Sequence, residues 1–143
     1  MSKNELKILL LIEDNPGDAR LLREMLQEHE SQGTVLTHVE YMSEAEKHLA
    51  RNVVDMILLD LNMPRMDGRE VLALIKKDDN LKTIPTVILT SSQAEADVVK
   101  SYQLQANCYL SKPMHFEAFH NLVKSINDFW LTKVKLPQQE KSG

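Results

Sequence analysis

Acidic side chains directly follow two of the short apolar runs in this sequence. Glu13 and Asp14 come after the first run, and Asp60 comes after a second one. Thr90 and Lys112 lie at the ends of two further runs. If these runs are parallel strands, their carboxyl ends meet at one edge of a sheet, where such folds bind ligands. We therefore expect three carboxylates, a hydroxyl and an ammonium group to share one site.

These residue types predict phosphoryl-transfer chemistry. Three carboxylates at one edge repel one another unless a cation lies among them. A set of oxygen donors without His or Cys favours a hard cation, Mg²⁺ rather than Zn²⁺. An aspartate beside such a cation can attack phosphorus and form an aspartyl-phosphate. Asp60 would then be the nucleophile, while Lys112 would balance the phosphoryl charge and the Thr90 hydroxyl would donate a hydrogen bond to it.

The apolar pattern predicts the elements that position these residues. Continuous apolar runs between polar residues are typical of strands buried on both faces. They lie at residues 8–12, 56–59 and 87–89, and weaker runs lie at residues 35–39 and 108–110. Apolar residues at helical spacing lie between and after them, at 19–26, 71–75 and 116–130. Five successive strand–helix units predict an α/β fold, in which helices cover both faces of a parallel sheet.

Capping residues predict where the helices begin. Asn15 precedes Pro16, which suits the first helical position. Three further pairs have capping-box spacing or come close to it: Ser43 with Glu46, Asp67 with Glu70, and Ser92 with Glu95. Each pair follows an expected strand or the loop after one, so the strand–loop–helix alternation has support independent of the apolar pattern.

Length and composition indicate one globular domain. The chain has 143 residues, of which 43% are apolar and 27% charged. Its net charge of −4 argues against nonspecific nucleic-acid binding. The single cysteine, Cys108, cannot form an intramolecular disulfide, and no run is long enough for a signal peptide or a membrane span. We expect a cytoplasmic protein, with a domain over residues 1–131 that ends in an extended helix, and a tail over residues 132–143.

Five separated motifs resemble the receiver domain of two-component response regulators. They are Glu13-Asp14, Asp60 with Asn62-Met63-Pro64, Met66-Asp67-Gly68, Thr90-Ser91 and Lys112-Pro113. The resemblance extends from about residue 7 to about residue 127. It implies a flavodoxin-like three-layer sandwich with a five-stranded parallel sheet in the order 2-1-3-4-5.

The resemblance also implies roles for individual residues. Asp60 would accept a phosphoryl group from a histidine kinase or a phosphotransfer protein, without turnover of a substrate as in an enzyme. Glu13, Asp14, Asp60 and the backbone carbonyl of Asn62 would hold Mg²⁺. Lys112, joined to Pro113 by a cis peptide bond, would contact the phosphoryl group. Thr90 and Tyr109 would form the switch that reports phosphorylation.

A finer resemblance is to the regulators that pair with bacterial phytochromes. It rests on residues 67–72, 106–110 and 129–131 and on the closing Leu136-Pro137. These regulators are often dimers through the face formed by helix 4, strand 5 and helix 5, with help from a C-terminal extension. Phe129 and Trp130 would then be dimer contacts, or they would cover the bottom of the core, and the sequence leaves both interpretations open.

The alternative function is an aspartyl-phosphate phosphatase of the haloacid-dehalogenase type. Those enzymes generally carry a second Asp two positions after the nucleophile, where this chain has Asn62. The sequence also offers no insertion large enough for a cap domain. A regulator is therefore favoured, with output through a protein contact, a change in dimerisation or phosphoryl relay, and its downstream partner is not identified.

Overall fold

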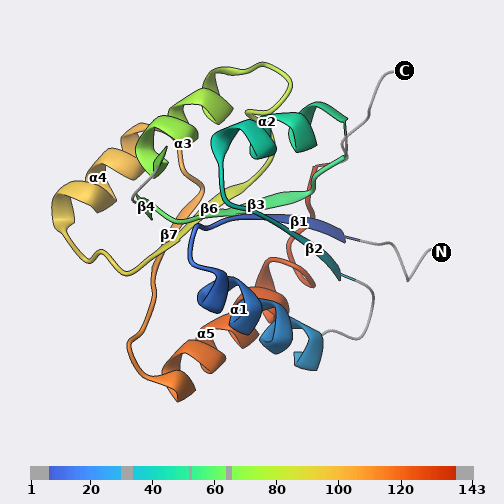
Figure 1. Cartoon of the computed structure of the whole chain (residues 1–143), viewed down its shortest axis with the longest axis vertical. Coiled ribbons are helices and arrows are strands. Elements are labelled where there is room, and N and C mark those ends of the chain that lie inside the picture. Colours follow the sequence, from blue (N-terminus) through green and yellow to red (C-terminus); the bar gives the residue numbers. More distant parts are fainter. Residues whose placement is uncertain (1–6, 30–33, 52, 64–65, 138–143) are drawn as a thin grey trace.

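The computed structural model describes residues 7–29, 34–51, 53–63 and 66–137. These residues form three layers around a five-stranded parallel sheet (Figure 1). The strands are β1 (Lys7–Ile12), β2 (Thr34–Val39), β3 (Met56–Leu59), β6 (Thr86–Thr90) and β7 (Cys108–Ser111). Their order is β2-β1-β3-β6-β7, so the predicted order of the five sheet strands is confirmed.

Helices cover both faces of this sheet, as the sequence pattern predicts. One face carries α1 (Pro16–His29) and α5 (Phe116–Phe129) (Figure 1). The other carries α2 (Met42–Arg51), α3 (Gly68–Lys77) and α4 (Glu95–Gln103). A short antiparallel pair, β4 (Asn62–Met63) and β5 (Met66–Asp67), lies between β3 and α3 and was not predicted.

Strand β1 shows why the apolar runs are continuous. Leu10 and Ile12 pack in the core cluster shared with α2 and α3, whereas Leu9 and Leu11 pack in the cluster shared with α1 and α5. Successive side chains of a strand point to opposite faces, and both faces are covered here. A central strand therefore needs apolar residues at every position, which gives the run its unbroken pattern.

Two of the predicted helix caps are confirmed. The Asn15 side chain accepts a hydrogen bond from the backbone amide of Asp18 at 3.0 Å, at the start of α1. The Asp67 side chain accepts one from the amide of Arg69 at 2.9 Å, at the start of α3. Each cap satisfies a backbone donor that has no partner within its helix.

The other two predicted caps, at Ser43 and Ser92, are wrong. Helix α2 begins at Met42, before Ser43, and the side chain of Glu44 bonds back to the amide of Glu40 at 3.0 Å. Helix α4 begins at Glu95 after Ala94, which makes no side-chain cap bond. The Ser92 hydroxyl instead donates a hydrogen bond to Asp97 at 2.6 Å, which ties the loop ahead of the helix to the first turn of α4.

The structure gives different surroundings to Phe129 and Trp130 at the end of α5, whose roles the sequence left open. The helix ends at Phe129, which is exposed, while Trp130 is partly buried against the core cluster beside α1. Their rings meet edge to face with centroids 5.7 Å apart. Trp130 therefore covers the core, and Phe129 is free to face a partner. The boundary after residue 131 stays a prediction, and residues 138–143 of the tail lie outside the described part.

Among the described helices, none is both long and apolar enough to cross a bilayer.

His48 on α2 should make stability depend on pH near neutrality. Burial lowers the pKa of His48 from its ordinary value of 6.5. As the pH falls through 6.5, the unfolded chain takes up a proton that the folded chain resists, so the contribution of His48 to the free energy of unfolding decreases. His48→Gln should remove this contribution, while the opposing contribution of Glu13, whose pKa is raised to about 7, stays in both proteins. Urea denaturation between about pH 7.5 and about pH 5.5 measures the slope, and equal slopes for the two proteins would contradict the expectation.

Candidate functional site

The residues that the sequence predicts to form the phosphoryl-transfer site lie together at the carboxyl edge of the sheet. β1, β3, β6 and β7 run parallel, so the residues after them lie at the same edge. A cavity of about 490 Å³ opens there. It is lined by Glu13, Asp14, Asn15, Pro16, Asp18, Asp60, Asn62, Ser91 and Lys112. The sequence therefore identified the edge and most of the polar residues that line it.

Lys112 joins three carboxylates in this cavity. Its Nζ lies 2.6 Å from Oε1 of Glu13, 3.0 Å from Oδ2 of Asp18 and 3.3 Å from Oδ2 of Asp60. The Glu13 and Asp60 side chains are only 4% and 8% exposed, whereas that of Asp18 is 42% exposed. Two buried carboxylates thus depend on one ammonium group for their charge compensation.

The surroundings separate the acidities of the two buried carboxyls. Burial raises the pKa of Glu13 to about 7, against the opposing charge of Lys112. Burial also acts to raise the pKa of Asp60, but the charge of Lys112 outweighs it, with hydrogen bonds from Thr90 and Asn62, and the net shift is downward. Asp60 is therefore an anion at neutral pH, which is the form that a nucleophile needs.

Lys112 keeps its proton at physiological pH. Burial acts to lower the pKa of Lys112, but the charges of Glu13 and Asp60 and a hydrogen bond to Asp18 raise it above its ordinary value. Its backbone amide donates a hydrogen bond to the carbonyl of Thr90 at 2.6 Å, which ties the residue to the end of β6. The ammonium group is therefore both charged and fixed in direction.

The expected cis peptide bond before Pro113 is wrong. None of the peptide bonds in the described part of the chain is cis, so Lys112 and Pro113 are joined in the trans form. Trans is the preferred form of such bonds by roughly 0.5–1 kcal/mol, and the Lys112 side chain reaches its carboxylate partners in that form.

The β4–β5 hairpin places Asn62 beside Asp60. The amide of Asn62 donates a hydrogen bond to Oδ1 of Asp60 at 3.1 Å. The Asn62 side-chain amide lies 3.4 Å from the hydroxyl of Thr90, whose side chain is fully buried. Pro64, the last residue of the Asn62 motif, lies outside the described residues.

Gly68 lets α3 begin directly against the site. Its amide bonds to the carbonyl of Leu61 at 3.2 Å. A Cβ at this position would collide with the carbonyl oxygen of Asp60 and would lie 2.5 Å from Cα of Leu61. Both obstacles are backbone, so they cannot move aside as a flexible side chain would. Only glycine fits where the helix meets the backbone of the phosphoacceptor candidate.

Gly68→Ala should lower the free energy of unfolding by about 1–3 kcal/mol, because the added methyl group forces the backbone at Asp60 to shift. Gly17→Ala is the matched control. Its added Cβ would meet only the side chain of Asn15, at 3.2 Å, and alanine has the better helix propensity. Urea denaturation compares the two variants. Equal stabilities would show that the contact at Gly68 does not matter.

Tyr109 contacts the loop that follows Thr90. Its hydroxyl donates a hydrogen bond to the carbonyl of Ser92 at 3.1 Å, and its ring packs partly buried against the core. The two predicted switch residues are therefore brought together through one loop. The sequence missed the rest of this network, in which Asp97 on α4 accepts hydrogen bonds from Ser92 and from Arg69 on α3. No local spacing relates Arg69 to Asp97, which lie 28 positions apart.

The sequence interpretation also missed Asp18 as a residue of the site around Lys112. It lies in the first turn of α1 and contacts Lys112 across 94 positions of sequence. A local signal did exist. The Asn15-Pro16 cap fixes the start of α1 at the edge of the sheet, so an acidic residue in the first turn had to lie near the strand ends.

The donor chemistry of the cavity fits a hard divalent cation. Glu13, Asp14, Asp60 and Asn62 all line it and offer oxygen atoms. Within the described ranges, however, no group of three or more His, Cys, Asp or Glu side chains is arranged to hold a metal ion. The ammonium group of Lys112 lies among the carboxylates.

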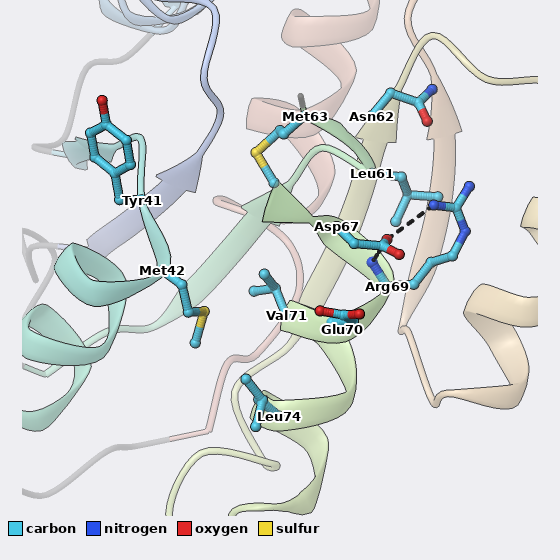
Figure 2. Close-up of a pocket in the computed structure, with 10 residues that line it drawn as sticks. All are labelled: Tyr41, Met42, Leu61, Asn62, Met63, Asp67, Arg69, Glu70, Val71 and Leu74. Carbon is cyan, nitrogen blue, oxygen red and sulfur yellow. Dashed lines mark hydrogen bonds and ion pairs between the residues drawn. The ribbon is translucent and has the colours of Figure 1, made fainter. Parts of the chain in front are cut away.

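A larger cavity, of about 740 Å³, lies beside this site (Figure 2). It is lined by residues of the β4–β5 pair, of the start of α2 and of the first two turns of α3. Its polar lining includes the ion pair of Arg69 with Asp67, at 3.1 Å, and its apolar lining includes Met42, Val71 and Leu74 (Figure 2). It contains neither Lys112 nor the carboxylates around it, so the chemistry belongs to the smaller cavity.

Known proteins with the same pattern are response regulators. The response regulator receiver domain matches residues 9–124. Response regulator Rcp1 of Synechocystis sp. is 42% identical over 143 residues, which cover 94% of this chain and 95% of Rcp1. The probable methanogenesis regulatory protein FilR2 of Methanothrix harundinacea is 34% identical, over 87% of this chain and 83% of FilR2.

Solved structures agree with the sequence relatives. The phosphorylated cyanobacterial phytochrome response regulator RcpA superposes with a TM-score of 0.88 at 40% identity, over 94% of this chain and all of RcpA. The Mn²⁺-bound form of Rcp1 gives a TM-score of 0.84 at 41% identity, over 92% of this chain and 99% of Rcp1. Together with the sheet order and the acidic edge beside Lys112, these similarities show that the chain belongs to the response regulator receiver family of two-component signalling proteins.

Proposed function

We propose that this receiver is switched by a phosphoryl group on Asp60, which a histidine kinase or a phosphotransfer protein donates in the presence of Mg²⁺. One observation carries the proposal: the buried Asp60 carboxylate is held as an anion beside the ammonium group of Lys112, 3.3 Å away. An anionic oxygen next to a fixed cation is suited to attack phosphorus, and the cation then balances the charge of the transferred group.

Each residue has a definite part in this transfer. An Asp60 carboxylate oxygen forms the new P–O bond while the P–N bond of the donor phosphohistidine breaks. Lys112 keeps its proton and pairs with a phosphoryl oxygen. Mg²⁺, held by Glu13, Asp14, Asp60 and the backbone carbonyl of Asn62, would neutralise the other oxygens. The donor set supports this assignment, and Rcp1 has been crystallised with Mn²⁺.

The output would pass through the loop after Thr90. A phosphoryl group on Asp60 would accept a hydrogen bond from the Thr90 hydroxyl and draw the loop toward the site. That loop carries the Ser92 carbonyl to which Tyr109 donates, so its movement would change the packing of Tyr109, which lies on β7 beside α4. The face formed by α4, β7 and α5 would then report the phosphorylation state.

We further propose that this face forms a homodimer, with the C-terminal extension taking part. Large apolar side chains are exposed on its helices, namely Val99 and Tyr102 on α4 and Phe116 and Phe129 on α5. Trp130 already packs on the core, so Phe129 would supply the aromatic contact. A phytochrome-type kinase is the proposed donor, because RcpA, a phytochrome response regulator, is 40% identical to this chain. The cytoplasmic location stays a prediction.

The phosphatase alternative receives no support, since the family match and the relatives are receivers. Incubation with acetyl phosphate and Mg²⁺, followed by intact-mass measurement, tests the proposal. We expect one phosphoryl adduct per chain, its loss in EDTA, and its location in the peptide that contains Asp60. An adduct on another peptide, or release of many equivalents of phosphate at a catalytic rate, would contradict the proposal. Sedimentation of the phosphorylated protein and of Phe129→Ala tests the dimer separately.

A further inference from the structure

Asp18 contacts the functional lysine more closely than the candidate phosphoacceptor does. Its Oδ2 lies 3.0 Å from Nζ of Lys112, whereas Oδ2 of Asp60 lies 3.3 Å from the same atom. Asp18 approaches from the first turn of α1, and Asp60 approaches from the end of β3. The ammonium group is therefore shared between an outer carboxylate on α1 and the inner pair formed by Glu13 and Asp60.

The hydrogen-bonding capacity of Lys112 is already used in full. An ammonium group has three N–H donors, and Nζ has three carboxylate partners, Glu13, Asp18 and Asp60. A phosphoryl group on Asp60 removes the carboxylate charge of that residue and can take over its hydrogen bond from Lys112. A second hydrogen bond from Lys112 to the phosphoryl oxygens must displace Glu13 or Asp18.

The exposure of these two partners decides which one gives way. Glu13 is almost completely buried, and a buried carboxylate that loses its cation has no water to replace it. The Asp18 side chain is 42% exposed, so water can solvate it as soon as Lys112 turns away. Its backbone is held independently, because the amide of Asp18 is bonded to the Asn15 side chain.

We infer that Asp18 is a positioning residue that holds Lys112 toward α1 and competes with the phosphoryl group for its ammonium. The inference rests on the proposed phosphorylation of Asp60. The negative charge of Asp18 at the mouth of the cavity acts in the same direction, because it repels an incoming phosphoryl anion. Asp18 thus weakens phosphoryl retention.

Beryllium trifluoride, an anion that binds carboxylates as a phosphoryl analogue, provides the test. Its affinity is measured by ¹⁹F NMR titration at a Mg²⁺ concentration shown to be saturating for each protein. Asp18→Asn should bind it about three- to tenfold more tightly than the wild type, because one competing charge has gone. Asp18→Glu keeps the charge and should return the affinity to within about twofold of the wild type.

Asp79→Asn is the matched control, because it removes the same charge from a surface pair with Lys82 away from the site, and its affinity should not change. Binding by Asp18→Asn that equals or falls below that of the wild type would overturn the inference while the proposed function stands. A wild-type protein that takes up neither beryllium trifluoride nor a phosphoryl group would overturn the proposed function itself. An Asp18→Glu variant that binds as tightly as Asp18→Asn would also overturn the inference, because the negative charge would then not be what weakens binding.

Discussion

Asp60→Asn should take up no phosphoryl group from acetyl phosphate, a loss of at least about a thousandfold in rate. The amide nitrogen and oxygen of asparagine carry no anionic lone pair, so the variant lacks the nucleophile. The side chain keeps its size, and its oxygen can still accept the hydrogen bond from the amide of Asn62. The fold should therefore survive, with a free energy of unfolding within about 1 kcal/mol of the wild type.

Intact mass after incubation with acetyl phosphate and Mg²⁺ measures this loss. Asp79→Asn, which removes a carboxylate that is 89% exposed and does not line the cavity, is the control and should be labelled as fully as the wild type. Labelling of Asp60→Asn at the wild-type level would mean that another side chain is the acceptor. Urea denaturation of both variants excludes unfolding as the cause of any difference.

Lys112→Ala should have the largest effect on stability. Without metal, the substitution leaves the buried Glu13 and Asp60 side chains without their cation, a loss of about 3 kcal/mol in the free energy of unfolding. The loss should grow as the pH rises above about 7, because the wild-type protein has Glu13 ionised there beside Lys112, whereas the variant must bury this charge without it. Mg²⁺ should restore part of the stability, because it supplies positive charge to the same carboxylates.

Urea denaturation in EDTA and in Mg²⁺, below and above neutral pH, measures these effects. The control is Lys82→Ala, whose ammonium pairs with Asp79 at the surface and is half exposed. Such pairs contribute little, so this variant should stay within about 0.5 kcal/mol of the wild type. If Lys112→Ala were no less stable than Lys82→Ala, Lys112 would not be the cation that compensates the buried carboxylates.

The sequence by itself determined the fold and the edge that carries the chemistry. Residues 8–12 and 56–59 are apolar at every position because both faces of a central parallel strand are covered, and runs this short are typical of such strands. The polar residues that break these runs, Glu13 and Asp60, must then lie at the carboxyl edge, whatever the details of packing. Residue type and position along the chain were sufficient for both conclusions.

Local sequence was less informative about where the helices begin, because a hydroxyl side chain can hydrogen-bond in more than one way. Ser43 and Ser92 have the spacing of capping residues, but the helices begin at Met42 and Glu95. Hydroxyl side chains bond with similar ease to a helix end or to a neighbouring loop, so the capping motif alone does not fix the boundary. At Ser92 the hydroxyl bonds to the side chain of Asp97 in the first turn of α4, although Ser92 is not the residue that caps this helix.

Only the tertiary structure decided which distant side chains share a partner. Asp18 and Lys112 lie 94 positions apart, and their contact depends on how α1 sits against the end of β7. The same holds for Trp130, which packs on the core, and for its neighbour Phe129, which faces outward. Such contacts arise from the direction and burial of single side chains after the elements have packed. Hydrophobic periodicity predicts which face of each element is buried, but it does not predict which single side chains from distant elements meet.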